Sequence, residues 1–360
     1  MKKIVSVCLA ALVLVSVFVL PSCGSKGETL MSLGGEKISV NMYRLWLSRV
    51  KGAYGGSDES IWDETAEDGR TYNEIFTEYV RKNAKTLLCA MYEFGKNGLK
   101  LSESDKKEIS DNMDAMLSER ADGNMNELNS VLSQYGVNYN ILKEVYTIEK
   151  KLSVLRESLY GENGTEKITD ETRDEYYNSN YVRIKQIFFY TSNKPVTDED
   201  GNYTYDENGY VVTRDFTEEE IAEQKNKAKL VSSSLTSGQD FDLLLSSQNE
   251  DTAAEAYPNG YYFTRTSQYA DGVIDAAFGL DIGEFTTVES EYGIHIIKRL
   301  PLEDKGYSLS ANADFFTDFE ENLVTDLFTA RLSAYEKDIK VNEELLAKYD
   351  VKSSVPNTTY

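Results

Sequence analysis

The sequence predicts an α+β protein with an all-helical domain built from both chain ends and a small antiparallel sheet domain, with surrounding helices, inserted between them. Three patterns favour this fold class. Apolar residues recur with a helical period over residues 36–160. From Tyr181 onward, apolar and polar residues alternate as in a strand. From Phe315 onward a helical apolar stripe returns, and it needs an apolar partner, which the N-terminal helices would supply.

Length and charge limit the classes of protein that this chain can belong to. It has 360 residues, more than the roughly 250–300 at which a single core stops growing, so two domains are expected. The 38 basic and 61 acidic residues give a net charge of −23, which argues against binding to nucleic acid or to anionic lipid. One His and three Cys offer little for a zinc site or a Cys/His pair, so no metal or cofactor is expected.

The N-terminal segment has the pattern of an export signal. Two lysines precede the uncharged run 4–20, and Leu-Pro-Ser-Cys follows at residues 20–23. This order resembles the lipobox of bacterial lipoproteins, which implies removal of residues 1–22, lipid on Cys23 and a tether over residues 23–35. An uncleaved anchor, or an ordinary signal peptide with an incidental Cys, stays open. All three alternatives place the protein outside the cytoplasm.

The next segment, 36–180, is expected to form the N-terminal part of the helical domain. Ser39 can cap a first helix, and Ser102 with Asp105 matches a capping box. The remaining Cys89 lies in an apolar helical pattern, which predicts a buried structural thiol. Further helices are expected over residues 72–95, 139–160 and 169–178.

Residues 181–303 carry the strand patterns and are expected to form the inserted domain. A turn-rich stretch, 191–216, predicts a projecting hairpin turning at Asn208-Gly209. The other predicted elements are a strand from 181, a helix after the capping box 217–220, short helices over 240–245 and 273–278, and a final strand over 292–300. Residues 304–350 then predict a long helix that packs on the N-terminal domain, followed by a tail over 351–360.

Several segments of the inserted domain resemble parvulin-type (PpiC) peptidyl-prolyl isomerases. Residues 183–188, Arg-Ile-Lys-Gln-Ile-Phe, resemble the opening parvulin strand, and residues 249–251, Asn-Glu-Asp, resemble the acidic turn. Residues 292–297, Tyr-Gly-Ile-His-Ile-Ile, resemble the closing strand. With the lipobox and the helical flanks, the chain is similar to extracytoplasmic foldases of the PrsA/SurA type. That resemblance implies a parvulin domain inserted into a helical chaperone domain.

The resemblance also implies a set of site residues. His295, Asp251 and Ser290 match the catalytic positions of the family, whereas Gln186 stands where the first parvulin His is usual. A glutamine can still donate and accept hydrogen bonds, although it cannot carry a proton charge. The substrate-binding positions correspond to Tyr269, Val273, Phe278 and Phe263.

The expected function is that of a membrane-anchored foldase that isomerises X–Pro bonds in secreted proteins and chaperones them. Its partners would be unfolded or newly exported proteins and, through lipid on Cys23, the outer face of the bacterial cell membrane. The alternative is a non-enzymatic holdase whose degenerate parvulin domain only binds polypeptide. A solute-binding lipoprotein would need alternating βαβ units, which residues 36–160 lack. A homodimer stays open.

Overall fold

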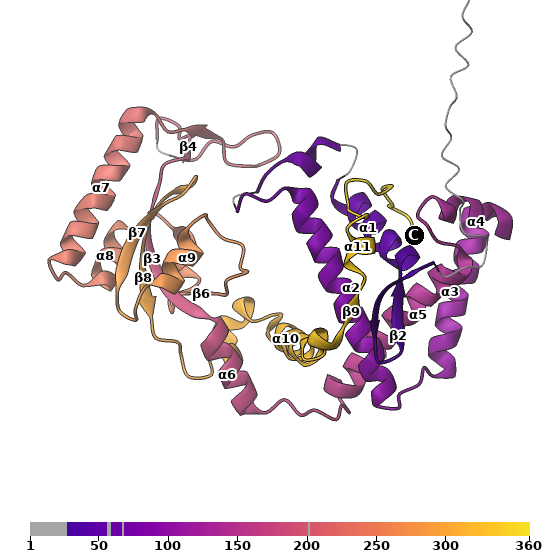
Figure 1. Ribbon diagram of the computed structural model, residues 1–360. Helices are drawn as coiled ribbons and strands as arrows, with labels where there is room; N and C mark the ends of the chain where they lie inside the picture. The colour runs from indigo at the N-terminus through magenta and orange to yellow at the C-terminus, as the bar shows by residue number, and fades with distance from the viewer. Residues whose placement is uncertain (1–26, 56–58, 67, 201) are drawn as a thin grey trace, which may run out of the picture. The chain divides into compact units, whose positions relative to one another are not determined.

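The structure is a computed structural model that describes residues 27–55, 59–66, 68–200 and 202–360. The predicted signal segment and Cys23 lie outside these residues. The chain divides into two compact units, Met1–Lys167 with Thr325–Tyr360, and Ile168–Val324. Both units combine helices with small antiparallel sheets, which confirms the α+β class (Figure 1).

Helices make up most of the first unit, and polar side chains determine where they begin. Ser39 Oγ accepts from Met42 N at the start of the first helix, and the expected capping box of Ser102 with Asp105 is present. Cys89 is buried, as predicted. The helices are α1 (Val40–Tyr54), α2 (Tyr72–Lys96), α3 (Glu103–Ala121), α4 (Met125–Ser133), α5 (Tyr139–Tyr160) and the short α11 (Glu343–Leu346).

The expectation of an all-helical domain is wrong, because the first unit also contains a three-stranded antiparallel sheet. Strand β1 (Thr29–Leu33) pairs with β2 (Glu36–Ser39) on one edge and with β9 (Lys340–Val341) on the other. Gly34 and Gly35 join the first two strands with φ values of +55° and +100°, a conformation that favours glycine in a tight hairpin. The third strand comes from the far end of the chain, so no local pattern could predict it.

The C-terminal segment of the first unit packs against its N-terminal helices. Phe328 and Leu332 belong to the same buried core as the N-terminal helices. The buried Glu93 of α2 accepts a hydrogen bond from Arg331 Nε, and Arg331 Nη1 lies 2.8 Å from Glu166 Oε1. A buried carboxylate without a partner would lower the stability of the fold, so the pairing with Arg331 stabilises Glu93 in the core.

The predicted long C-terminal helix is corrected by the structure. The helix α10 spans only Phe319–Ser333, and a 3-10 turn precedes it at Ser310–Phe315. The start of the expected stripe, Phe315 and Phe319, packs within the second unit instead. The C-terminal boundary of the inserted domain, expected at residue 303, therefore lies at residue 324.

The second unit is built on a four-stranded antiparallel sheet with the strand order β6-β3-β8-β7. One face is covered by α7 and α8 and the other by α9 (Figure 1). Each face therefore has its own buried cluster of apolar side chains. The elements are β3 (Val182–Tyr190), β6 (Tyr261–Phe263), β7 (Phe285–Glu289), β8 (Gly293–Leu300), α7 (Glu218–Thr236), α8 (Phe241–Gln248) and α9 (Val273–Gly279).

The helix before the first strand of this sheet, α6 (Asp170–Asn180), also belongs to the second unit, so the boundary expected at residue 180 is corrected to 167. An aromatic cluster explains the difference. The ring of Tyr177 lies 5.7 Å from that of Phe316, and the ring of Tyr181 lies 5.0 Å from the same phenylalanine. Aromatic ring pairs of this kind stabilise a core beyond the effect of burying their apolar surface, and here they join α6 to the second unit.

Residues 191–200 and 202–216 form a projecting segment, here called the arm. Its outer strands β4 (Asn193–Pro195) and β5 (Thr213–Asp215) pair antiparallel, and a third segment around Thr204 lies against both. The expected pairing across Asn208-Gly209 is present as a bridge between Tyr205 and Val211. Within the described part of the chain, no helix is both long and apolar enough to cross a bilayer.

Candidate active site

The register of two strands brings the expected polar residues to one face of the sheet. In the β3–β8 pair, Phe188 lies opposite His295 and Gln186 lies opposite Ile297. Because side chains alternate along a strand, Gln186, Phe188 and His295 all point to the face that carries α9. The loop after α8 pairs with the free part of β3, since Glu250 N donates to Phe188 O at 2.9 Å. This pairing places Asp251 beside Gln186.

The polar side chains form one continuous hydrogen-bonded network. His295 Nε2 lies 2.9 Å from Ser290 Oγ, and His295 Nδ1 lies 3.0 Å from Gln186 Oε1. Gln186 Nε2 lies 2.8 Å from Asp251 Oδ2 and 2.6 Å from the hydroxyl of Tyr269. The same Asp251 oxygen accepts from Tyr261 at 2.8 Å, and its other oxygen accepts from Ala253 N at 2.9 Å.

The carboxylate of Asp251 determines the orientation of the rest of the network. A carboxylate only accepts, so the Gln186 amide must turn its nitrogen toward Asp251 and its oxygen toward His295. His295 must then carry its proton on Nδ1, which leaves Nε2 to accept from the hydroxyl of Ser290. Each member therefore has one direction of donation, and the imidazole is held in a single tautomer.

Burial keeps the imidazole of His295 uncharged. Only 3% of His295 is exposed, and burial lowers its pKa to about 4, although the charge of Asp251 acts in the opposite direction. Burial also raises the pKa of Tyr269 to about 12, and a hydrogen bond from Gln186 opposes the rise. At neutral pH the site therefore offers an uncharged imidazole and an intact tyrosine hydroxyl.

A cavity of about 560 Å³ opens directly onto this network. Aromatic rings form much of its wall, and Asp251 is the only Asp, Glu, Lys or Arg among the described residues that line it. Such a mixture of apolar walls and a few positioned polar groups is typical of a site that holds a small apolar group in a fixed orientation. No group of three or more His, Cys, Asp or Glu within the described ranges could hold a metal ion. The lining residues are Gln186, Phe188, Tyr190, Asp251, Ala253, Tyr261, Gln268, Tyr269, Ala270, Tyr292 and His295.

The sequence of this unit matches a known family model. Residues 177–300 match the model of the PPIC-type PPIase domain. These residues form a PPIC-type peptidyl-prolyl isomerase domain. The match covers β3 to β8 and thus every member of the network. No curated protein matches the chain.

Solved structures of foldases and chaperones are similar to the whole chain at low identity. PrsA from Bacillus subtilis is 18% identical, with 82% of this chain and 93% of that chain covered and a TM-score of 0.25. The peptidylprolyl isomerase PrsA from Bacillus cereus is 18% identical, with 89% and 96% covered and a TM-score of 0.28. A SurA-like chaperone of Campylobacter jejuni is 12% identical, with 92% and 100% covered and a TM-score of 0.21. Because all three TM-scores are low, the assignment depends on the match over residues 177–300.

The structure brings together five of the residues that the sequence singled out in the isomerase domain. His295, Asp251, Gln186, Ser290 and Tyr269 are all members of the network. Their roles in catalysis stay a prediction, but their mutual contacts are those that a shared site requires. Gln186 takes the central position and bridges the imidazole to the carboxylate.

The three other residues expected to bind substrate in the isomerase domain do not line the cavity. Val273 has no exposed surface, so the expectation that it touches substrate is not met. Phe278 packs in the same core, where Arg265 lies over its ring. Phe263 supports the site from behind, because its ring lies 4.7 Å from that of Tyr269. These residues hold the cavity wall in place.

Sequence reasoning missed several residues that line the cavity. Phe188 and Tyr190 could have been found from the strand period alone, since they follow Gln186 at intervals of two. Tyr261 carries no such signal, because its strand has only three residues and the Asp251 that its hydroxyl contacts lies in a separate loop. Tyr292 lies in the turn before β8, where sequence patterns do not fix the direction of a side chain.

Proposed function

We propose that this chain is a membrane-anchored extracytoplasmic foldase that isomerises X–Pro bonds in exported proteins and chaperones them. The observation that carries the proposal is the aromatic cavity that opens onto the hydrogen-bonded network of His295, Gln186 and Asp251. The match to the PPIC-type domain supports it. The first unit would supply the chaperone surface and lipid on Cys23 would supply the anchor.

The chemistry of X–Pro rotation suits a site of this kind. Rotation about the peptide bond meets a barrier of about 18–20 kcal/mol, and it needs no covalent step. A catalyst has to hold the proline ring and bind the twisted amide better than the planar one. Phe188, Tyr190 and Tyr261 offer an apolar wall for the ring, and the polar network is positioned beside it.

Tyr269 is the group best placed to act on the twisted amide. Its ring lines the cavity and is 37% exposed, and its oxygen accepts a hydrogen bond from Gln186. Its own proton is thereby directed away from Gln186 and toward the cavity, where it can donate to the substrate amide. A donor that is oriented before the reaction stabilises a developing charge without reorganisation.

The test is an NMR exchange measurement of cis–trans rates on a proline tetrapeptide with the full chain. We expect catalysed exchange in the wild type and a loss of roughly 10–100-fold in kcat/KM for Tyr269→Phe, which removes only the hydroxyl. Tyr79→Phe, an exposed tyrosine of α2 in the first unit, is the matched control and should leave the rate unchanged. A wild-type rate equal to the uncatalysed one would contradict isomerase activity.

A non-enzymatic holdase is the second candidate, and the substitution of Gln186 at a position where the family has His favours it. The two functions separate in one experiment on a refolding client followed by light scattering. A holdase suppresses aggregation of proline-free and proline-containing clients alike, and it leaves the tetrapeptide exchange rate unchanged. The anchor is tested by mass spectrometry of the native N-terminus, where a chain that begins with unmodified Cys23 or with Met1 would contradict it.

A further inference from the structure

We propose that the arm, residues 191–200 and 202–216, binds the segment of a client polypeptide that flanks the proline, and that it selects segments rich in Lys, Arg and apolar side chains. This inference rests on the proposed function, because it assigns the specificity of that same site. The arm lies between β3 and α7 in the chain and begins where the cavity wall ends. A polypeptide whose proline lies in the cavity would therefore continue along the arm.

Continuity with the cavity is shown by contacts at the base of the arm. Tyr190, the last residue of β3, lines the cavity, and the next residue, Thr191, donates its N–H to Tyr292 O at 3.1 Å. Tyr292 lines the cavity as well. The N–H of Tyr190 donates to Glu250 Oε2 at 3.0 Å, next to Asp251 in the cavity wall. The base of the arm is therefore held against the cavity.

The arm presents aromatic side chains to solvent. Tyr203, Tyr205 and Tyr210 are 56%, 62% and 72% exposed, more than any other described tyrosine. Exposed tyrosines supply large contact areas at a small cost in conformational entropy, and for this reason they are enriched in binding surfaces. Val211 and Val212 add apolar surface beside them.

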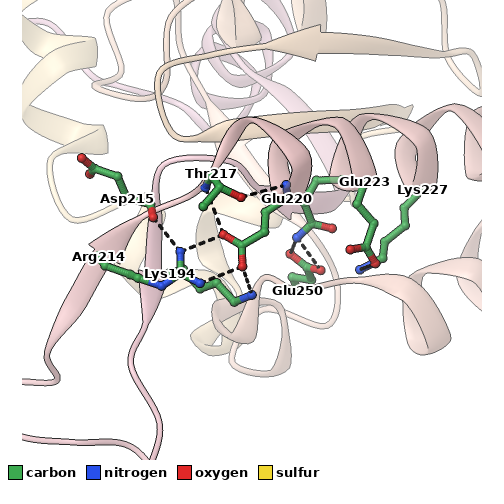
Figure 2. Close-up of polar contacts among 9 residues, drawn as sticks. Lys194, Arg214, Asp215, Thr217, Glu220, Glu223, Lys227 and Glu250 are labelled. Carbon is green, nitrogen blue, oxygen red and sulfur yellow. Dashed lines mark hydrogen bonds and ion pairs between the residues drawn. The ribbon is translucent and has the colours of Figure 1, made fainter.

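The arm carries an excess of acidic side chains. It contains six acidic residues and two basic ones, Lys194 and Arg214. Both basic groups are paired with Glu220 of α7, at 2.6 Å and 2.7 Å, as Figure 2 shows. The cavity adds the carboxylate of Asp251. A polypeptide that follows the cavity and the arm therefore meets aromatic rings and negative charge, to which basic and apolar side chains are complementary.

The base of the arm is held in place, so the aromatic surface is kept at the cavity. Glu220 also accepts from Thr217 N at 3.0 Å within the capping box that starts α7. One turn further along this helix, Gln224 Nε2 donates to Glu250, which in turn accepts from the N–H of Tyr190. The same helix therefore anchors both the arm and the loop that carries Asp251. A surface that is ordered before binding loses less entropy on binding.

The test compares two peptides with the same central Ala-Pro and long flanks of leucine mixed with either lysine or glutamate. The affinity of each for the full chain is measured by fluorescence anisotropy, and the tetrapeptide exchange rate is measured beside it. The wild type should bind the lysine peptide more tightly than the glutamate peptide, and the difference should shrink as salt is raised. Tyr203→Ser with Tyr205→Ser should weaken the lysine peptide roughly tenfold and leave tetrapeptide exchange unchanged.

Two further variants complete the design. Glu199→Gln with Glu207→Gln removes two exposed charges of the arm and should weaken the lysine peptide roughly threefold. Tyr79→Ser, in the first unit, is the matched control and should bind both peptides like the wild type. Equal affinity of the double tyrosine variant and the wild type, or equal affinity of the wild type for both peptides, would overturn the inference. If the wild type did not accelerate tetrapeptide exchange, the isomerase function would be refuted. The two long peptides would still test the arm, because their binding is measured separately from exchange.

Discussion

The two faces of the sheet in the isomerase domain are made by the same strands and have different contents. On the face covered by α7 and α8, the buried side chains of β3 and β8 are all apolar. On the face that carries α9, the apolar Ile184 and Ile297 are each followed or preceded at an interval of two by a polar residue, Gln186 in β3 and His295 in β8, and both polar residues line the cavity. The first face contains Ile187, Phe189, Ile294 and Ile296. The comparison teaches that a strand period of two lets neighbouring residues serve stability on one face and chemistry on the other.

The largest effect should come from removing the imidazole on the polar face. We expect His295→Ala to lower kcat/KM for X–Pro exchange by roughly 10–1,000-fold, because Gln186, Ser290 and the cavity lose the group that connects them. The folded state should lose only about 1–3 kcal/mol, the usual result of leaving buried polar partners unpaired. Exchange rates and urea unfolding of the same preparation measure both quantities. A loss of stability with no loss of rate would contradict a catalytic role.

The neighbouring residue on the apolar face should show the opposite behaviour. Ile296→Ala removes a side chain with no exposed surface and should lower the free energy of unfolding by about 2–5 kcal/mol. Its kcat/KM per folded molecule should match the wild type, because Ile296 points to α7 and α8 and not to the cavity. If both substitutions lowered rate and stability to the same extent, the division between the faces would be wrong.

A smaller effect is expected from changing the bridge between the imidazole and the carboxylate. Gln186→Met keeps the length of the side chain but leaves Asp251 and His295 Nδ1 without their shared partner, so kcat/KM should fall. Gln186→His can still accept from one side and donate to the other, and it should raise kcat/KM. The two variants are compared in the same exchange assay. A rise for the methionine variant would show that the bridge has no part in catalysis.

Local patterns in the sequence predicted much of this fold. The capping residues Ser39, Ser102 and Thr217 begin helices as expected, because each signal is complete within four residues. The strand β9 was missed because it consists of two residues that pair with β1 from the other end of the chain. The unit boundaries were displaced for a related reason, since Tyr177 and Phe316 meet only after folding.

The site was predicted in part. His295 and Asp251 lie in segments that resemble the family. The register of β3 and β8 then brings His295 within hydrogen-bond distance of Gln186. Tyr261 was missed, since its contact with Asp251 depends on the path of the chain between two elements. Val273 was expected to touch substrate, but the structure buries it completely below the cavity wall. The resemblance to the family predicted the polar residues of the site better than its apolar contacts. A hydrogen bond requires particular atoms, whereas many apolar side chains can fill the same space.

The smallest effect concerns pH. Burial lowers the pKa of His295 to about 4 from its ordinary value of 6.5, so the unfolded chain takes up this proton first as the pH falls. The contribution of His295 to stability should therefore be complete above pH 6.5 and should decrease as the pH falls toward 4. Between pH 6 and 8 neither His295 nor Tyr269, whose pKa is raised to about 12, changes its charge, so kcat/KM should be constant there. A bell-shaped rate profile in that range would indicate that another group titrates in the site.

The most direct test of this account is the NMR spectrum of the single imidazole of the chain. Because His295 is the only histidine, chain labelled with ¹⁵N in histidine gives one pair of ring nitrogen signals. We expect a proton on Nδ1 and an unprotonated Nε2, both set by Asp251 through Gln186, and a titration midpoint of about 4, set by burial. A midpoint at or above 6.5 would contradict the claim that burial keeps the imidazole uncharged, and a proton on Nε2 would contradict the claim that the carboxylate of Asp251 fixes its tautomer.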